Sequence, residues 1–251
     1  MLTRMMQLAS SPSPASLSHD PAATLRRQFP ALRHLLGEPA FARLGDLAIG
    51  HSAAQGVPAD SDSGVPARAF VHGILVHGDV SAPDGVPARL LADVAALEAA
   101  LADVQALAPR AQHEPRLSLA ELTALPAAAR DAAALRPTRA LRLVPVAHRL
   151  ATWLRDVHEG RSPAPPRRGE QHVAFYALPG LLSAHDETPI TWWHGLPPGE
   201  GLLLARAALG VPLGALRAEA LQRRWVASEE ELDAWFACWA REGLFAEIVA
   251  G

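Results

Sequence analysis

The sequence is poor in several residue types on which common protein functions depend. Its single cysteine, Cys238, excludes an internal disulfide and a metal site of clustered thiolates. It contains no lysine, so every basic residue is arginine, and the formal net charge is −3. Such a chain lacks the electrostatic footprint of a protein that grips nucleic acid through phosphates, and it has no polybasic membrane anchor. No apolar run approaches the ~20 residues of a membrane span, and no secretory signal is evident, so we expect a cytoplasmic protein.

Motifs for nucleotide binding and nucleophilic catalysis are also absent. The sequence has no G-x-G-x-x-G or Walker loop and no G-x-S-x-G elbow. Cys238 has no obvious histidine partner in the sequence, which indicates a buried or half-buried thiol rather than a nucleophile. None of the 11 histidines shows the i, i+4 spacing of a metal site; His72 and His77 are five residues apart, and His185 precedes Asp186. We expect no metal, no cofactor and no catalytic residue in this chain.

The residues that are present predict a folded, mainly helical protein. Hydrophobic residues make up 49% of the sequence and are mostly alanine and leucine, whereas aromatic residues make up only 5%. There are six tryptophans against one tyrosine, and most of the tryptophans lie from Trp192 onward. A specialised surface or core is therefore expected near the C-terminus.

The first half of the chain predicts a flexible leader followed by a helical domain. Residues 1–21 include a Ser/Pro-rich stretch. Residues 22–108 form the predicted helical domain, with a helical pattern over 22–50 that Pro30 interrupts and a clear helix over 88–107. Residues 51–88 are rich in Gly, Pro, Asp and Ser and are expected to be irregular.

Residues 115–251 predict a second domain that mixes strands and helices. Strands are expected over 140–151, 172–178 and 190–196, with a short helix after the first, and helices over 199–209, 213–224 and 228–242. Three strands followed by three helices are typical of a winged-helix-like domain. The predicted fold class is therefore mainly α with a small β component: an N-terminal helical domain and a C-terminal winged-helix-like α+β domain.

The last predicted helix is the most completely specified element. Ser228 and Glu231 have the spacing of a capping box, and Gly243 supplies the end of the helix. Four large apolar side chains fall on one helix face: Leu232, Trp235, Phe236 and Trp239.

Two interpretations of these C-terminal aromatic residues stay open. Large aromatics on one helix face are usually the core of a small domain. However, Trp192 and Trp193 are neighbours on a predicted strand and cannot both enter one core, because side chains alternate between the faces. If that strand is an edge, its free backbone groups can accept an extended peptide, and the nearby helix can supply pockets.

Three segments resemble a known family in the same order along the chain. QFPALRHLLGEPAFARLGDLAIGH (28–51), LLADVAALEAAL (90–101) and RALRLVPVAHRLATWLRDVHEG (139–160) are similar to segments of HvfC/BufC-type proteins. The resemblance covers about residues 24–245. The chain departs from the family pattern in its Ser/Pro-rich leader and in residues 51–88.

The resemblance implies an adaptor in the biosynthesis of ribosomal peptides that are modified after translation (RiPPs). In this family the C-terminal domain resembles a precursor-peptide recognition element, and the partner is a multinuclear non-heme iron-dependent oxidative enzyme that holds the iron. The N-terminal helical domain would dock on that enzyme in a heterodimer. The peptide leader would pair with the third strand and lie against the third helix, at positions that here correspond to Ile190, Thr191, Trp192, Trp193, Leu232, Trp235, Phe236 and Trp239.

The alternative from the same fold class is a winged-helix DNA-binding regulator. Its recognition helix would be residues 213–224, which carry Arg217, Arg223 and Arg224. The last predicted helix instead begins with three glutamates, which phosphates would repel.

Overall fold

A computed structural model describes residues 21–54, 86–182 and 189–249. The predicted leader lies outside these residues except for Pro21. Most of the segment predicted to be irregular, from 55 to 85, also lies outside them. Where that segment is described, it is helical at 51–54 and again from Ala88.

The N-terminal region is helical, as the sequence predicts. Its helices are α1 (Pro21–Gln28), α2 (Pro30–Leu36), α3 (Glu38–Ala54) and α5 (Ala88–Ala111). Pro30 begins α2 and so separates it from α1, and Gly37, with a φ of 74°, ends α2. Helix α5 continues past the predicted end at Leu107 and contains Pro109, because a proline near the end of a helix removes only one backbone hydrogen bond.

Two short helices and a strand follow: α6 (Leu119–Ala124), α7 (Ala127–Ala132) and β1 (Ala134–Pro137). A complete capping box starts α6, with Ser118 and Glu121 at the S-x-x-E spacing. The Ser118 hydroxyl accepts a hydrogen bond from the Glu121 amide at 3.2 Å, and the Glu121 carboxylate accepts one from the Ser118 amide at 2.7 Å.

The central sheet has three antiparallel strands in the order β2 (Arg142–His148), β3 (Arg168–Leu182) and β4 (Pro189–Leu196). All three strands overlap segments that the sequence predicts as strands, and β3 extends beyond the predicted 172–178 at both ends. Helix α8 (Ala151–His158) connects β2 to β3, also as predicted. The register places Phe175 opposite both Arg142 and Trp193.

Three helices complete the C-terminal region: α9 (Pro198–Ala208), α10 (Leu213–Gln222) and α11 (Glu229–Arg241). Gly243, with a φ of 67°, ends α11, and the Leu244 amide bonds back to the Trp239 carbonyl at 3.0 Å. The capping box predicted at the start of α11 is only half formed. Ser228 accepts from the Glu231 amide, but the Glu231 carboxylate accepts from the Ala227 amide at 2.7 Å, one residue before the expected donor.

A second, two-stranded sheet is absent from the sequence-based expectations. Strand β5 (Phe245–Val249) pairs antiparallel with β1, with Ala134 opposite Val249. These partners lie more than a hundred residues apart in sequence. Two short strands that pair over such a distance leave no local periodicity that could predict them.

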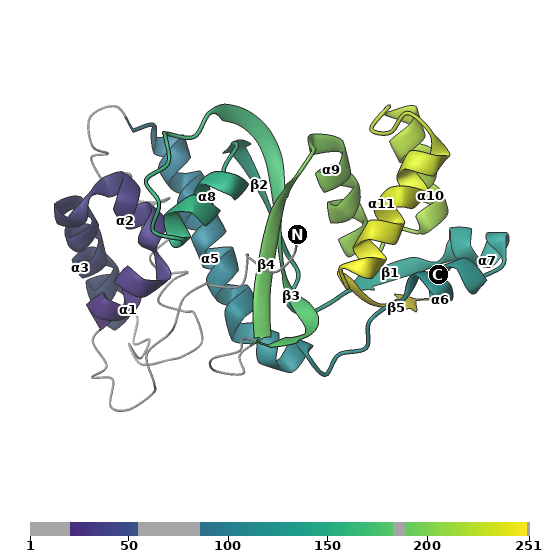
Figure 1. Ribbon diagram of the computed structural model, residues 1–251, viewed down its shortest axis with the longest axis horizontal. Coiled ribbons are helices and arrows are strands. Elements are labelled where there is room, and N and C mark those ends of the chain that lie inside the picture. Colours follow the sequence, from purple (N-terminus) through teal and green to yellow (C-terminus); the bar gives the residue numbers. More distant parts are fainter. Residues whose placement is uncertain (1–20, 55–85, 183–188, 250–251) are drawn as a thin grey trace.

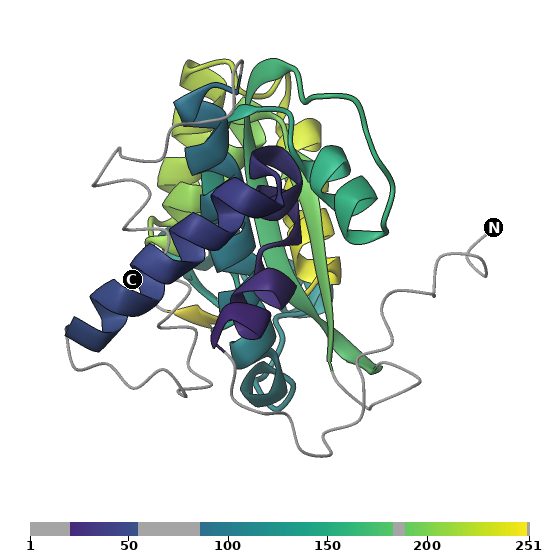
Figure 2. The same ribbon diagram turned by 90° about the vertical axis from the view of Figure 1, so that its left-hand side faces the viewer.

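The central sheet is covered on both faces, and each face contributes to its own apolar core. Figure 1 shows α1, α2, α3, α5 and α8 on one side of the sheet and α9, α10 and α11 on the other, and Figure 2 shows α1 to α3 outermost on the first side. Val173 and Phe175 of β3 belong to the core with the N-terminal helices, and Ala174 and Tyr176 belong to the core with the C-terminal helices. Helix α5, from the predicted first domain, therefore packs on the sheet of the predicted second domain.

The fold is thus mixed α/β, with helices that predominate and strands in two sheets. Within the described part of the chain, every helix is too short or too polar to cross a membrane.

Candidate functional site

Strand β4 forms one outer edge of the central sheet. The Trp193 carbonyl accepts a hydrogen bond from the Arg155 guanidinium at 2.9 Å, so this carbonyl points away from β3. Backbone groups alternate along an antiparallel strand, and the register with β3 is regular from Thr191 to Leu196. The backbone groups of Thr191 and Gly195 therefore also point outward. No strand among the described residues pairs with this edge.

The opposite edge of the sheet, on β2, is closed. Pro145 has no N–H group to offer, and the Ala147 amide donates to the buried Asp93 carboxylate of α5 at 2.8 Å. Proline and covering elements are two ways in which proteins protect the edge of a sheet. Because β2 is protected in both ways, β4 is the edge of this sheet that can accept another strand.

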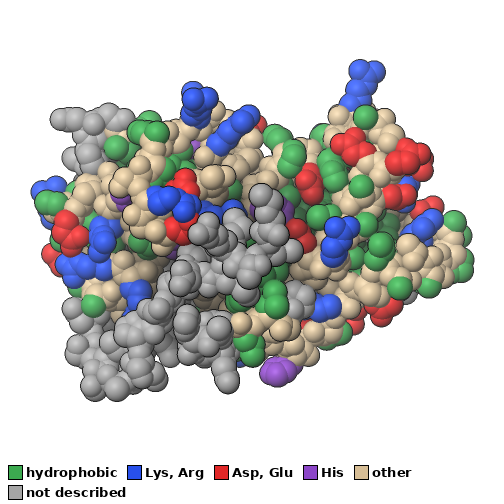
Figure 3. Space-filling view, in the orientation of Figure 1, with side chains coloured by type: hydrophobic (Ala, Val, Ile, Leu, Met, Phe, Trp, Pro, Cys, Tyr) green, Lys and Arg blue, Asp and Glu red, His purple; other side chains and the backbone are tan. Residues whose placement is uncertain are grey.

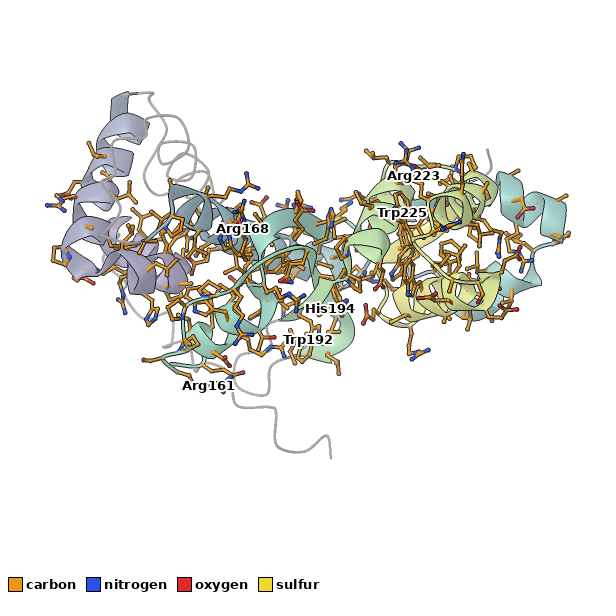
Figure 4. All side chains as sticks on the ribbon, turned by 90° about the horizontal axis from the view of Figure 1, so that it is seen from above. Arg161, Arg168, Trp192, His194, Arg223 and Trp225 are labelled. Atoms are coloured by element: carbon orange, nitrogen blue, oxygen red, sulfur yellow. The ribbon has the colours of Figure 1, made fainter. Side chains whose placement is uncertain are left out.

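Trp192 and Trp193 lie on opposite faces of the sheet, as their adjacency in a strand requires. Trp193 is 8% exposed and stacks with Phe175 at 6.0 Å between ring centroids, in the core with the N-terminal helices. Its indole N–H donates to the Ala151 carbonyl at 3.1 Å. Trp192 is half-buried against the other core. Figure 4 shows Trp192 next to His194 along β4, between the two groups of helices.

Arg155 of α8 reaches over the outer edge of β4. Its guanidinium carbon lies 5.1 Å from the centre of the Trp192 ring and 5.9 Å from that of Trp193, both within the range of cation–π contacts. The side chain is half-buried. One positive charge is therefore held at the edge by two aromatic rings and one carbonyl.

On the side of α9 and α11, the edge borders a group of acidic and polar side chains. The Tyr176 hydroxyl lies 3.5 Å from Nδ1 of His194, and Nε2 of His194 lies 4.0 Å from a carboxylate oxygen of Glu242, just after α11. Burial raises the pKa of Tyr176, and the negative charge of Glu242 raises it further. Tyr176 is therefore a neutral hydrogen-bonding group at physiological pH.

Glu200 and Cys238 lie close to this group. Oε1 of Glu200 accepts a hydrogen bond from the Trp239 indole at 3.1 Å, and burial raises the pKa of Glu200. Burial also raises the pKa of the Cys238 thiol, with Glu242 and Glu200 acting in the same direction. Cys238 is half-buried, as the sequence predicts, and a raised pKa disfavours the thiolate, which is the reactive form of cysteine.

Most of the predicted peptide-binding residues on α11 lie in the core. Leu232 is fully buried, and Phe236 and Trp239 are 5% and 1% exposed. The rings of Phe236 and Trp239 are in edge-to-face contact at 5.3 Å. Trp235 is half-buried at the margin of the same core. Between β4 and the end of α11, Nε2 of His194 lies 4.0 Å from the Glu242 carboxylate, whereas Leu232, Phe236 and Trp239 face the core.

The predicted residues on β4 are more accessible. Ile190, Thr191 and Trp192 are all half-buried, and Trp193 alone is buried. The Thr191 hydroxyl is shielded from solvent and has no hydrogen-bond partner within the described structure.

Within the described parts of the chain, no group of three or more His, Cys, Asp or Glu residues is arranged to hold a metal ion. His72, His77, His185 and Asp186, which the sequence raises as metal-binding candidates, lie outside these parts.

Sequence reasoning does not identify Arg155, Tyr176 or Glu242. Arg155 is one of many arginines and lies almost forty residues before the strand it contacts. An unusual signal does exist for Tyr176, because it is the only tyrosine of the chain. Only the pairing of β3 with β4 brings it next to His194.

A comparison of the sequence with models of known protein families finds no match, and a comparison with curated proteins finds none either.

Proposed function

We propose that this protein is a non-catalytic partner protein that binds the leader of a ribosomal precursor peptide along the outer edge of β4. It would present that peptide to a multinuclear non-heme iron-dependent oxidative enzyme. The observation that carries the proposal is the contrast between the two edges of the sheet. Pro145 and Asp93 close β2, whereas the outward backbone groups of β4 at Thr191 face no strand in the described structure.

The order of elements supports a winged-helix-like recognition module. Strands β2, β3 and β4 come first and helices α9, α10 and α11 follow, with α8 inserted between the first two strands. A peptide added to β4 would extend this sheet by a fourth strand. On the side of α9 and α11 it would contact Trp192 and His194, and on the side of α8 it would contact Arg155.

The position of the aromatic residues changes the predicted contacts. Leu232, Phe236 and Trp239 lie in the core of this module. Affinity for a peptide would instead come from main-chain hydrogen bonds to β4 and from Trp192. The N-terminal helices on the other face of the sheet would supply the docking surface for the enzyme. Holding both partners raises the effective concentration of the peptide at the enzyme without any chemistry in this chain.

Arg217 of α10 and Arg223, the residue after this helix, weigh against the alternative of a DNA-binding regulator. Arg217 pairs with Glu229 at 3.5 Å and with Asp233 at 3.0 Å, both on α11. Arg223 pairs with Glu219 at 3.1 Å. Acidic and basic side chains are interspersed over this part of the surface in Figure 3. These ion pairs would have to break before the two arginines could bind a phosphate backbone.

The proposal is tested by the variants T191P and T191V. T191P removes an outward N–H group from the edge and leaves the bonds between β3 and β4 in place, whereas T191V keeps the N–H group and the shape of the side chain. Peptides selected from a phage-displayed random library on the full-length protein should bind T191V and should lose binding to T191P. If no peptide is selected, or if T191P binds as well as T191V, the proposal is wrong.

The partner is tested by co-expression. An iron enzyme and a small peptide encoded beside this protein should co-purify with it, and the complex should contain iron only when the enzyme is present. An enzyme that fails to associate, with or without the peptide, contradicts this half of the proposal.

A further inference from the structure

The guanidinium of Arg155 lies at the outer edge of β4. It donates to the outward carbonyl of Trp193 at 2.9 Å and lies over the rings of Trp192 and Trp193. These contacts come from α8, an element between two strands of the sheet. The guanidinium is thus fixed in the position where a peptide paired with β4 would pass.

The charge of Arg155 is not neutralised by any carboxylate in the described structure. The acidic residues nearest to it in sequence are Asp156 on α8 and Glu159 just after this helix, and both pair with Arg161 instead. Some other partly buried arginines do have such partners: Arg136 binds Glu114 at 3.0 Å, and Arg217 binds Asp233 at 3.0 Å. A guanidinium has five N–H donors, and among the described residues a single hydrogen bond, to Trp193, engages one of them.

Two roles are consistent with this position, and they predict opposite effects. A charged side chain at a sheet edge can protect the edge against pairing, and Arg155 occupies the place where an incoming N–H group would bond to Trp193. Alternatively, Arg155 can bind a carboxylate of the incoming peptide through its remaining donors. The rings of Trp192 and Trp193 favour the second role, because they hold the guanidinium in one orientation before a ligand arrives.

We propose that Arg155 selects peptides with an acidic side chain, Asp or Glu, at the position that passes Trp193. The guanidinium would bind this carboxylate through two parallel N–H···O bonds and keep its contact with the Trp192 ring. This inference rests on the proposed function, since it requires a peptide along β4. It adds the class of side chain that the edge recognises.

The test uses the full-length protein and a phage-displayed library of random dodecapeptides. Peptides selected on the native protein should share Asp or Glu at one position. Replacing that residue by Gln or Asn in a synthetic peptide should weaken binding by about tenfold or more, the usual scale for a hydrogen bond to a charged group. The R155Q variant should bind the acidic and the neutral peptide equally.

Two further variants separate charge, geometry and folding. R155K keeps the charge without the planar fork and should recover only part of the preference for the acidic peptide. R168Q removes an exposed arginine at the start of β3, away from the edge, and should bind like the native protein. Urea unfolding of each variant shows whether it is folded. If R155Q is not folded, the role of Arg155 is judged from R155K, which should show a smaller preference for the acidic peptide than the native protein does.

The outcomes separate this inference from the proposed function. Selected peptides that bind in a Thr191-dependent manner but share no acidic residue overturn the role of Arg155 and leave the proposed function standing. Tighter binding by R155Q, or its self-association in size-exclusion chromatography, shows an edge-protecting role and also overturns the inference. A library that yields no binding peptide overturns both.

Discussion

Nδ1 of His148, at the end of β2, lies 2.8 Å from a carboxylate oxygen of Asp93 on α5. Both side chains are buried, at 7% and 3% exposure. The same carboxylate oxygen accepts the Ala147 amide, and the other oxygen lies 2.9 Å from the Arg89 guanidinium. One aspartate therefore joins the start of α5 to the closed edge of the sheet.

Replacing Asp93 by Ala should lower the free energy of unfolding by about 3 kcal/mol, because it leaves a buried imidazole and a partly buried amide without their acceptor. Urea unfolding followed by tryptophan fluorescence measures the change. D156A is the matched control, since its exposed ion pair with Arg161 is worth about 1 kcal/mol or less. Equal losses in the two variants would contradict the structural role of Asp93.

The two neighbouring tryptophans of β4 should differ in their effects. W193A removes a buried ring from the core and a hydrogen bond to Ala151, so it should cost about 3–5 kcal/mol of unfolding free energy. W192A removes a half-buried ring and should cost less, but it should weaken peptide binding. Titration of each folded variant with a selected peptide, beside its urea unfolding curve, tests both statements. The prediction fails if W192A is the less stable of the two.

Truncations on α11 should act on stability rather than directly on peptide affinity. L232A and F236A each remove a buried side chain and should lower the unfolding free energy by about 2–5 kcal/mol. W235A, at the margin of the core, should lower it less. Peptide affinity measured where all three variants remain folded should be close to that of the native protein. A large loss of affinity in folded L232A would instead place the peptide against this helix face.

The stability of the protein should fall as pH rises above the ordinary pKa range of a carboxyl group, because of Glu98. Its two carboxylate oxygens accept the amides of Ala31 at 2.7 Å and Leu32 at 2.9 Å inside the core. Burial raises the pKa of Glu98 above its ordinary value of 4.5, against the opposing effects of His158 and the two amides. Between the ordinary and the raised pKa the folded state binds more protons than the unfolded state, so the free energy of unfolding falls with pH there.

This pH dependence is measured by urea unfolding at several values from about pH 4 to about pH 8, the range in which carboxyl groups and histidines titrate. The E98Q variant should show a flatter curve, since it lacks the titrating group. E170Q, which alters an exposed carboxyl group, is the control and should follow the native protein. Parallel curves for E98Q and the native protein would show that Glu98 does not titrate in this window.

The sequence predicts the elements whose determinants are local. Pro30 and Gly37 divide the first helices, Ser118 and Glu121 cap α6, and Gly243 ends α11, and each of these acts on residues within a few positions. The adjacency of Trp192 and Trp193 is also local, and it correctly requires that their side chains lie on opposite faces. Each of the three strands of the central sheet can also be predicted from its own residues, without knowledge of its pairing partner.

What the sequence does not predict depends on contacts between distant segments. The β1–β5 pair, the binding of Asp93 to Ala147 and the reach of Arg155 over β4 all join elements that no periodicity connects. The aromatic face of α11 illustrates the other difficulty. An apolar stripe predicts which side of a helix is covered, but it does not distinguish a core from a ligand, and here Leu232 and Trp239 are covered by the protein itself.

The pairing of Ala134 with Val249 has a mechanical consequence. β1 and β5 run antiparallel, so the start of β1 and the end of β5 lie at the same end of the ribbon. Tension between the chain before β1 and the chain after β5 would therefore break their hydrogen bonds one after another, beginning at this pair. This ribbon has four residue pairs in its register, whereas β3 and β4 have seven. A partner that pulls on the C-terminal strand would therefore peel off β5 first, while β4 and its outer edge keep their shape.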